Sequence, residues 1–243
     1  MNRLLIALSL TLALGLAAPC LLNADQVFFG EDLNNNCCVR IAHPNADAAQ
    51  AAFLSYLVGV GTETFETYAT GTGVPLAITF PGAGTATLNG SGNVSTEVTG
   101  TNGFGRYPIS GDNFWEVDAL SFEVDFSQPV AAFGFYGVDI GDFGGQLTLT
   151  LSDGSTIVKT VPNTIGSSGS TDGSVLYYGI IDVDHPFTRV QFGDSTTDDV
   201  FAFDDMTIGS LQQVVPGVPE PGTMLLLGTA LLGLSSVLRR RSA

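Results

Sequence analysis

Strict alternation between apolar and polar residues is the feature that most limits the fold of this chain. The segments Phe122–Phe126 (FEVDF) and Leu147–Leu151 (LTLTL) both alternate without a break. A period of two places every second side chain on the same face of a strand, which predicts half-buried antiparallel strands rather than a parallel sheet covered by helices. We expect the apolar face of these segments to be buried: Phe122, Val124, Leu147, Leu149 and Leu151.

Other segments between residues 25 and 212 have the same character. Short β-prone runs occur at residues 76–80, 85–88, 130–137, 156–161, 175–181, 189–192 and 200–208. Turn signals separate several of them: PGAG at 81–84, SDGS at 152–155 and SSGSTDGS at 167–174. Many short strands with glycine-rich turns predict a mainly β fold, an antiparallel β-sandwich and most simply a jelly roll. The chain has no repeat of fixed period, which argues against a propeller or a β-helix.

One helix is expected before these strands, over Asn45–Leu57. Asn45 is the expected N-cap, and Asp47 in the first turn is favoured by the helix dipole. Apolar residues recur at helical spacing, namely Ala49, Phe53, Tyr56 and Leu57. We expect this helix to pack across one sheet or to close an open end of the sandwich, and to be the only substantial helix outside the two ends of the chain.

The first 24 residues have the layout of a secretory signal peptide. One positive charge at Arg3 precedes an apolar stretch from Leu4 to Ala18, and small residues follow. We expect an N-terminal signal helix that is cleaved after Ala24; an uncleaved membrane anchor is the alternative. Cys20 belongs to this leader, and Cys37 and Cys38 are adjacent, so they cannot join distant parts of the fold. They can remain thiols or form a vicinal disulfide.

The other end of the chain has three parts in a fixed order. Pro219, Glu220 and Pro221 precede an apolar run of 16 residues, from Thr223 to Leu238, and Arg239, Arg240 and Arg241 follow it. As a helix, 16 residues span about 24 Å, which barely crosses a bilayer core of about 30 Å. The arginines would stop transfer and stay in the cytoplasm. This arrangement predicts a C-terminal transmembrane helix whose exposed motif is cut on the outer face, by analogy with other removable sorting tails.

The tail VPEPGTMLLLGTALLGLSSVLRRR resembles the PEP-CTERM sorting signal of Gram-negative bacteria. That resemblance implies processing by a membrane protease called exosortase, and an association with exopolysaccharide and biofilms. It also implies transient anchoring in the inner membrane, followed by release to the cell surface or the extracellular matrix. The expected organisation is a signal peptide at 1–24, a β-sandwich ectodomain at 25–212, a proline-rich linker at 213–222, and a transmembrane segment with a basic tail at 223–243.

The charge of the chain is concentrated between its ends. All 24 acidic residues lie between Asp25 and Glu220, whereas only four of the eight basic residues do, so this part carries 4 − 24 = −20. Such a surface repels nucleic acid and anionic lipid and attracts cations. Solubility in salty or crowded surroundings and calcium binding both account for it.

Two acidic segments far apart in the sequence suggest a calcium site. Phe65-Glu66 near the start and Phe203-Asp204-Asp205 near the end resemble the structural calcium site of β-sandwich carbohydrate-binding and adhesion modules. That resemblance implies a structural Ca²⁺ held by Glu66 with Asp204 or Asp205. Adjacent residues of a strand point to opposite faces, so one of the two aspartates should point inward, which needs a cation or hydrogen bonds. Solvated acids at a strand end are the alternative.

The segment Gly137–Gly145 (GVDIGDFGG) is a weaker metal candidate. Asp139 and Asp142 lie there in a glycine-rich connection, without the spacing of an EF-hand. A tight turn stabilised by aspartate side chains is the alternative.

The sequence contains only weak signals for sugar binding and for catalysis. Trp115 and Tyr136 are the candidates for an aromatic surface that stacks on a glycan, with core packing as the alternative. The only histidines, His43 and His185, belong to no nucleophile motif, and the chain has no G-x-S-x-G elbow. We therefore expect no catalytic residue and a structural or adhesive, non-enzymatic protein with possible polysaccharide binding. Two alternatives remain: a secreted glycan-active hydrolase, and a matrix protein without a ligand site.

Overall fold

The structure is a computed structural model that describes residues 25–140, 145–162, 172–193 and 199–215. The expected signal helix, the C-terminal transmembrane helix and the PEP motif lie outside these residues. Within the described ranges, no helix is long and apolar enough to cross a membrane.

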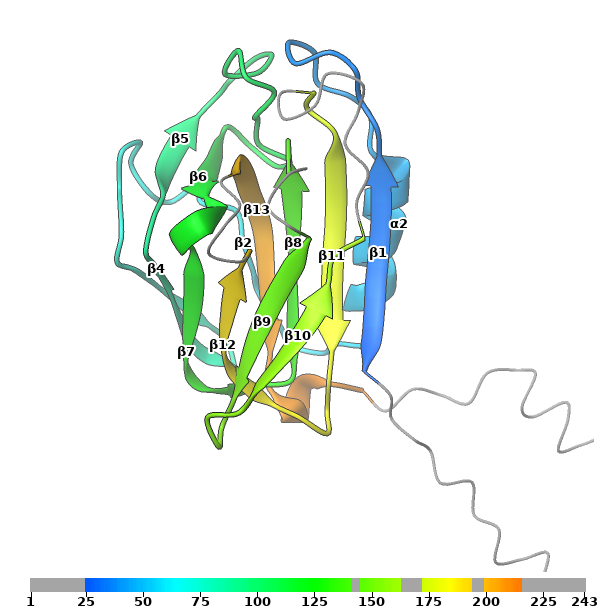
Figure 1. The fold of residues 1–243 in the computed structure, drawn as a ribbon, viewed down its shortest axis with the longest axis vertical. Helices are drawn as coiled ribbons and strands as arrows, with labels where there is room; N and C mark the ends of the chain where they lie inside the picture. The colour runs from blue at the N-terminus through cyan, green and yellow to red at the C-terminus, as the bar shows by residue number, and fades with distance from the viewer. Residues whose placement is uncertain (1–24, 141–144, 163–171, 194–198, 216–243) are drawn as a thin grey trace, which may run out of the picture.

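Two antiparallel sheets form the body of the protein (Figure 1). The seven-stranded sheet has the order β1 (Gln26–Asp32), β11 (Val175–Ile181), β8 (Ala132–Val138), β13 (Val200–Gly209), β6 (Asn113–Asp118) and β5 (Asn93–Thr96), with the short β2 (Thr62–Glu63) also paired to β13. The six-stranded sheet has the order β10 (Thr156–Thr160), β9 (Gln146–Leu151), β12 (Phe187–Phe192), β7 (Glu123–Val130), β4 (Gly84–Asn89) and β3 (Leu76–Phe80). The prediction of a mainly β fold with antiparallel sheets is confirmed.

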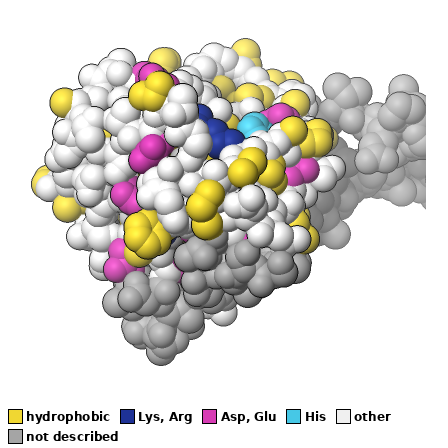
Figure 2. All heavy atoms as spheres, turned by 90° about the horizontal axis from the view of Figure 1, so that it is seen from above, with side chains coloured by type: hydrophobic (Ala, Val, Ile, Leu, Met, Phe, Trp, Pro, Cys, Tyr) yellow, Lys and Arg dark blue, Asp and Glu magenta, His cyan; other side chains and the backbone are white. Residues whose placement is uncertain are grey.

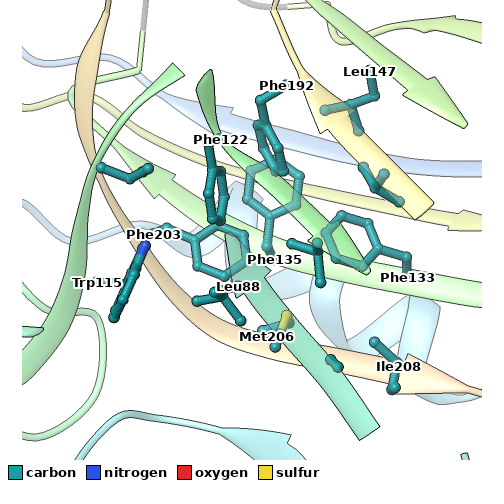
Figure 3. Packing of buried hydrophobic residues seen from close by; sticks show 14 of the residues in the cluster. Leu88, Trp115, Phe122, Phe133, Phe135, Leu147, Phe192, Phe203, Met206 and Ile208 are labelled. Atoms are coloured by element: carbon teal, nitrogen blue, oxygen red, sulfur yellow. The ribbon is translucent and has the colours of Figure 1, made fainter. Parts of the chain in front are cut away.

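Phenylalanine rings fill the space between the two sheets (Figure 3). Phe135 of β8 stacks on Phe203 of β13 with ring centroids 5.2 Å apart, and it meets Phe192 of β12 edge to face at 5.1 Å. Phe122 lies 4.7 Å from Phe192 and 5.3 Å from Phe203. Offset and edge-to-face aromatic pairs of this kind stabilise a fold beyond the area that they bury. The two sheets are therefore joined through one aromatic cluster.

The alternating segments place their side chains as expected, with one exception. Phe122, Val124, Leu147 and Leu149 are fully buried in this core. Leu151 is only partly buried, because it is the last residue of β9 and leads into the tight turn at 152–155. The period of two therefore identified both strands and their buried faces.

The helix is shorter than expected and begins differently. The helix α2 spans Pro44–Leu54, and Tyr56 and Leu57 follow it as partly buried residues. Its N-cap is His43, not Asn45, and no side chain within the helix caps it. Instead the carboxylate of Asp32, at the end of β1, accepts hydrogen bonds of 3.0 Å from the backbone N–H groups of Asn45 and Ala46. A cap supplied from another element leaves no local sequence signal.

Among the described residues, α2 is the one α-helix, and η1 (Ala119–Ser121) and η2 (Leu211–Gln213) are short 3₁₀ turns.

Glycines let α2 lie close to the outer face of the seven-stranded sheet. Gly179 of β11 is paired with Gly134 of β8, and both lie beneath the ring of Phe53. A Cβ atom at Gly179 would come within 2.7 Å of that ring, and one at Gly134 within 2.9 Å. At Gly30 of β1, a Cβ atom would come within 2.1 Å of the carbonyl oxygen of Asn45. These three glycines form a surface without side chains, which lets the helix pack closely against the sheet.

The sequence analysis missed four strands and assigned Gln213, Val214 and Val215 to the linker. The missed strands are β1, β2, β5 and β6, of which β2 and β5 are short and β1 and β6 lack strict alternation. The domain continues through Gln213 to Val215, three residues into the segment expected to be an exposed linker. Gln213 is buried, and its amide donates hydrogen bonds to the carbonyl oxygens of Gly59 (2.7 Å) and Pro81 (2.9 Å).

Replacing Gly179 by Val should lower the free energy of unfolding by about 1–3 kcal/mol, because the added side chain cannot fit beneath Phe53 and must displace α2. Urea denaturation of the purified protein measures the loss. The control is Gly73→Ala, where a Cβ atom meets its nearest neighbour at 3.7 Å and should cost much less. Equal losses in the two variants would contradict the close packing of α2 on the glycines of the sheet.

Candidate functional site

The fold brings together the two acidic segments that the sequence analysis singled out. β2 pairs with β13 so that Glu63 faces Met206 and Thr62 faces Thr207. The buried ring of Phe65 follows β2 directly and lies 6.3 Å from the ring of Phe203. Phe65-Glu66 and Phe203-Asp204-Asp205 are therefore neighbours in space, although about 140 residues separate them in the sequence.

A β-bulge sets the geometry of the two aspartates. The register of β13 against β8 shifts between Asp204 and Thr207, and Asp205 has a positive φ of 48°. Asp204 Oδ2 accepts hydrogen bonds from the backbone N–H groups of Ile109 (2.8 Å) and Ser110 (3.2 Å). Asp205 Oδ1 accepts one of 2.5 Å from the Ser110 hydroxyl. Both carboxylates thus hold the same segment, so the expectation that they point to opposite faces is wrong, because the bulge breaks the alternation.

Glu66 holds the other end of that segment. Its Oε1 accepts hydrogen bonds from the backbone N–H groups of Asp112 (3.0 Å) and Asn113 (2.6 Å). Glu66, Asp204 and Asp205 therefore act together on residues 109–113, the stretch that leads into β6. We call these three residues the carboxylate clamp.

Burial raises the pKa of both aspartates in the clamp. The pKa of Asp204, which is fully buried, lies well above its usual range, first because of desolvation and then because of the neighbouring charge of Asp205. The backbone N–H groups of Ile109, Ser110 and Asp205 oppose this shift. Desolvation also raises the pKa of Asp205, against hydrogen bonds from Ser110 and Gln50. Hydrogen bonds satisfy the inward charge that the sequence analysis assigned to a cation or to hydrogen bonds.

The described residues contain no group of three or more His, Cys, Asp or Glu side chains arranged to hold a metal ion. Four of the hydrogen bonds to Asp204 and Glu66 come from backbone N–H groups, which occupy oxygens that a cation would need. The structural calcium ion expected at Glu66 and Asp204 or Asp205 stays a prediction.

A chain of polar side chains leads from the clamp to the start of α2. Gln50 hydrogen-bonds Asp205 and also accepts a hydrogen bond of 3.3 Å from the Tyr136 hydroxyl. That hydroxyl lies 2.8 Å from Asp47 Oδ1, which is also 2.8 Å from His43 Nδ1. His185 likewise contacts an aspartate of its own segment, Asp182, at 3.1 Å. Both histidines therefore have structural partners close in sequence.

The expected aromatic surface is not formed by Trp115 and Tyr136. Trp115 is 0% exposed and stacks on Phe65 between the sheets, and Tyr136 is 1% exposed beneath α2. Neither ring offers a face to a sugar, so the core-packing alternative describes both.

An aromatic side chain that the sequence analysis did not consider is exposed instead. Phe104 is 58% exposed and lies in the loop between β5 and β6. The side chain of Asn102 accepts hydrogen bonds from the backbone N–H groups of Phe104 (3.0 Å) and Arg106 (3.2 Å), which fixes the turn. The Arg106 guanidinium lies 5.3 Å from the centre of the ring. The run Asn-Gly-Phe-Gly at 102–105 was the available signal, since such dipeptides mark tight turns.

The weaker metal candidate Asp139 is a buried anchor between loops. It has a positive φ of 61°, and its Oδ1 accepts a hydrogen bond of 3.2 Å from the backbone N–H of Gly173. Its Oδ2 lies 3.5 Å from Arg106 Nη1. Desolvation raises the pKa of Asp139 to about 7, although Gly173 and Arg106 lower it. The other candidate in that segment, Asp142, lies outside the described residues.

The C-terminal segment leaves the domain from a well-anchored position. Val214 bridges to Leu57, and the N–H of Val215 donates a hydrogen bond of 2.8 Å to the carbonyl oxygen of Tyr56. Figure 1 shows that this exit and the start of β1 lie at the same end of the two sheets. The loops that carry Phe104 and the paired cysteines lie at the opposite end, which Figure 2 shows from above.

Comparison with known proteins identifies the tail. Residues 217–241 match the model of the PEP-CTERM protein-sorting motif. No curated protein matches the chain, and no solved structure does. The tail therefore carries a recognised sorting signal.

Asp139→Asn should reduce the pH dependence of stability between pH 5 and pH 8. A carboxyl whose pKa is raised on folding binds its proton more tightly in the folded state, so the free energy of unfolding falls as pH rises from about 4 through about 7. Removing this group should shrink the difference between pH 5 and pH 8 by about 2 kcal/mol, measured by urea denaturation at both pH values.

The matched control for Asp139 is Asp153→Asn, in the exposed turn between β9 and β10. The pKa of Asp153 is lowered by its hydrogen bonds with Ser155, so its contribution to stability is lost only below this pH window. A wild-type pH profile in the Asp139 variant would show that burial of this carboxyl is not what couples stability to pH.

Proposed function

We propose that this chain is an exported cell-surface or extracellular-matrix protein, whose β-sandwich is delivered by exosortase-dependent processing of its C-terminal tail. The observation that carries the proposal is the sorting motif at residues 217–241. This motif implies export and membrane anchoring through the tail before processing, and it makes exosortase the expected partner.

The attachment of the tail suits such processing. Val215 is the last residue that the structure describes, and seven residues, 216–222, separate it from the apolar run in the sequence. Even fully extended, seven residues reach about 25 Å. The tethered domain is thus held close to the membrane, with its exit end facing the bilayer. Pro216, Pro219 and Pro221 disfavour helix in this segment, which favours an extended substrate for a protease.

The finer role that we propose is structural or adhesive, with polysaccharide as the ligand class and a jelly-roll-like sandwich as the scaffold. Phe104 supports this role, because an exposed aromatic ring on a fixed turn suits stacking on the apolar face of a sugar. A secreted glycan-active hydrolase is the first alternative. A matrix protein without a ligand site is the other alternative.

The mature protein should end near Glu220 and lack Arg239–Arg241. Intact-mass analysis of the protein recovered from the native cell surface measures its C-terminus. Glu220→Ala should leave the full tail in place and keep the protein in the membrane fraction, because it removes the charge of the motif. Pro216→Ala is the matched control in the same linker, outside the Pro-Glu-Pro tripeptide, and should be processed as the wild type is. Recovery of surface protein with its tail intact would refute the proposal.

A glycan array probed with the mature protein, in calcium and in EDTA, tests the ligand class and the cation together. Phe104→Ala should weaken glycan binding at least tenfold, whereas Val98→Ala, which truncates another exposed side chain of the same loop, should not. If Glu66 and Asp204 hold calcium, EDTA should weaken binding or lower the melting temperature, and Glu66→Ala should remove that effect. No binding to any glycan would favour the matrix protein without a ligand site.

A further inference from the structure

The loop between β1 and α2 places two thiols in contact. Cys37 Sγ and Cys38 Sγ lie 2.8 Å apart, within the loop at residues 33–39. Both thiols are free; Cys38 is exposed and Cys37 is partly exposed. Adjacent cysteines in an extended strand would direct their side chains to opposite faces, so the contact depends on the local conformation of this loop.

Hydrogen bonds fix that conformation. The side-chain oxygen of Asn34 accepts from the backbone N–H groups of Asn35 (2.8 Å) and Asn36 (3.1 Å), and its amide donates to the carbonyl oxygens of Asn36 (3.0 Å) and Val39 (2.9 Å). The side-chain oxygen of Asn36 in turn accepts from the N–H of Cys38 (3.0 Å). The turn that joins the two sulfur atoms is therefore closed by side chains of its own loop.

Neighbouring elements hold the loop at Asn34 and at Cys37. The backbone N–H of Asn34 donates a hydrogen bond of 2.8 Å to the Ser174 hydroxyl, next to the start of β11. The Thr101 hydroxyl donates one of 2.6 Å to the carbonyl oxygen of Cys37. Thr101 belongs to the loop that presents Phe104, so the cysteine pair is connected to the proposed binding end of the domain.

We propose that Cys37 and Cys38 are a redox-active pair that forms a reversible vicinal disulfide after export. The inference rests on the proposed function in one respect: an exported protein reaches an oxidising compartment, where disulfides form and persist. The oxidant is a disulfide, either that of an extracytoplasmic thiol oxidase or that of oxidised glutathione.

The chemistry assigns different roles to the two thiols. Cys38, the more exposed, attacks one sulfur of the oxidant disulfide as its thiolate and expels the other sulfur as a thiol, forming a mixed disulfide. Cys37 then attacks the Cys38 sulfur and releases the second thiol. The pair loses two hydrogen atoms and two electrons reach the oxidant. The pKa of the Cys37 thiol is raised, first by its hydrogen bond with Cys38, which fits a resolving thiol rather than the first nucleophile.

Geometry makes this disulfide easy to reduce. The Cα atoms of adjacent residues are about 3.8 Å apart, less than the separation of about 4.4–6.8 Å that disulfides prefer. A bridge between neighbours is therefore strained, and strained, exposed disulfides are the labile ones that respond to the redox conditions. Closing and opening the ring changes the backbone at Cys37, which is hydrogen-bonded to the Phe104 loop.

The test uses the full chain carrying Cys20→Ser, so that Cys37 and Cys38 are its only thiols. After incubation with oxidised glutathione, mass spectrometry should find the chain lighter by two hydrogen atoms, without thiols that react with an alkylating reagent. Millimolar reduced glutathione should restore both thiols. Two free thiols after oxidation, a bridge between two chains, or a disulfide that resists this reduction would each overturn the proposal.

Single variants distinguish the two roles. With Cys37→Ser, Cys38 should accumulate a mixed disulfide with glutathione, because the resolving thiol is missing. With Cys38→Ser, Cys37 should react at least tenfold more slowly. Equal rates for the two variants would contradict the assigned order of attack.

The native protein separates this inference from the proposed function. One intact-mass measurement on protein from the cell surface reports both the C-terminus and the state of the thiols. A processed tail with two reduced thiols would overturn the redox pair and leave the sorting proposal standing. An unprocessed tail, with a disulfide that still forms and opens in the purified chain, would overturn the sorting proposal and leave the redox pair standing.

Discussion

Hydrogen bonds from backbone N–H groups to carboxylates, most of them buried, hold the helix and the loops of this fold against its strands. Asp32 caps α2, the carboxylate clamp holds the segment before β6, and Asp139 receives the N–H of Gly173. An acid-rich domain with four basic residues cannot pair each buried acid with a cation. Backbone N–H groups give these carboxylates hydrogen-bond partners without adding positive side chains, and they oppose the desolvation that raises the pKa of Asp204 and of Asp139.

The same constraint explains where the sequence was informative. Alternation at Phe122–Phe126 and Leu147–Leu151 predicted two strands and their buried faces, because burial depends directly on the period. It predicted the wrong arrangement at Asp204 and Asp205, because a bulge is a local exception that needs the neighbouring strands to be specified. The capping of α2 was missed for a related reason. Asp32, whose carboxylate accepts the N–H groups at the start of the helix, precedes it in the sequence by more than ten residues and comes close to it only in the folded chain.

For the candidate site, too, the sequence predicted some features and missed others. The proximity of Phe65-Glu66 to Phe203-Asp204-Asp205 was predictable from a resemblance, and the structure places these segments side by side. What their carboxylates contact was not, because the partners are main-chain groups that carry no residue identity. Trp115 was singled out by its type, yet its position between the sheets buries it, whereas Phe104 is exposed by a turn of Asn and Gly residues.

The anchored exit at Val215 also determines how the domain would meet a mechanical load. A pull on the tail first meets the Leu57–Val214 bridge and the Gln213 amide, and then passes along β13. β13 is an inner strand with β8 on one side and β6 and β2 on the other, as Figure 1 shows. Its ladder hydrogen bonds run across the direction of pull, so they are sheared together instead of being unzipped one at a time. Before any processing, the tail is thus attached to a strand that has paired neighbours on both sides.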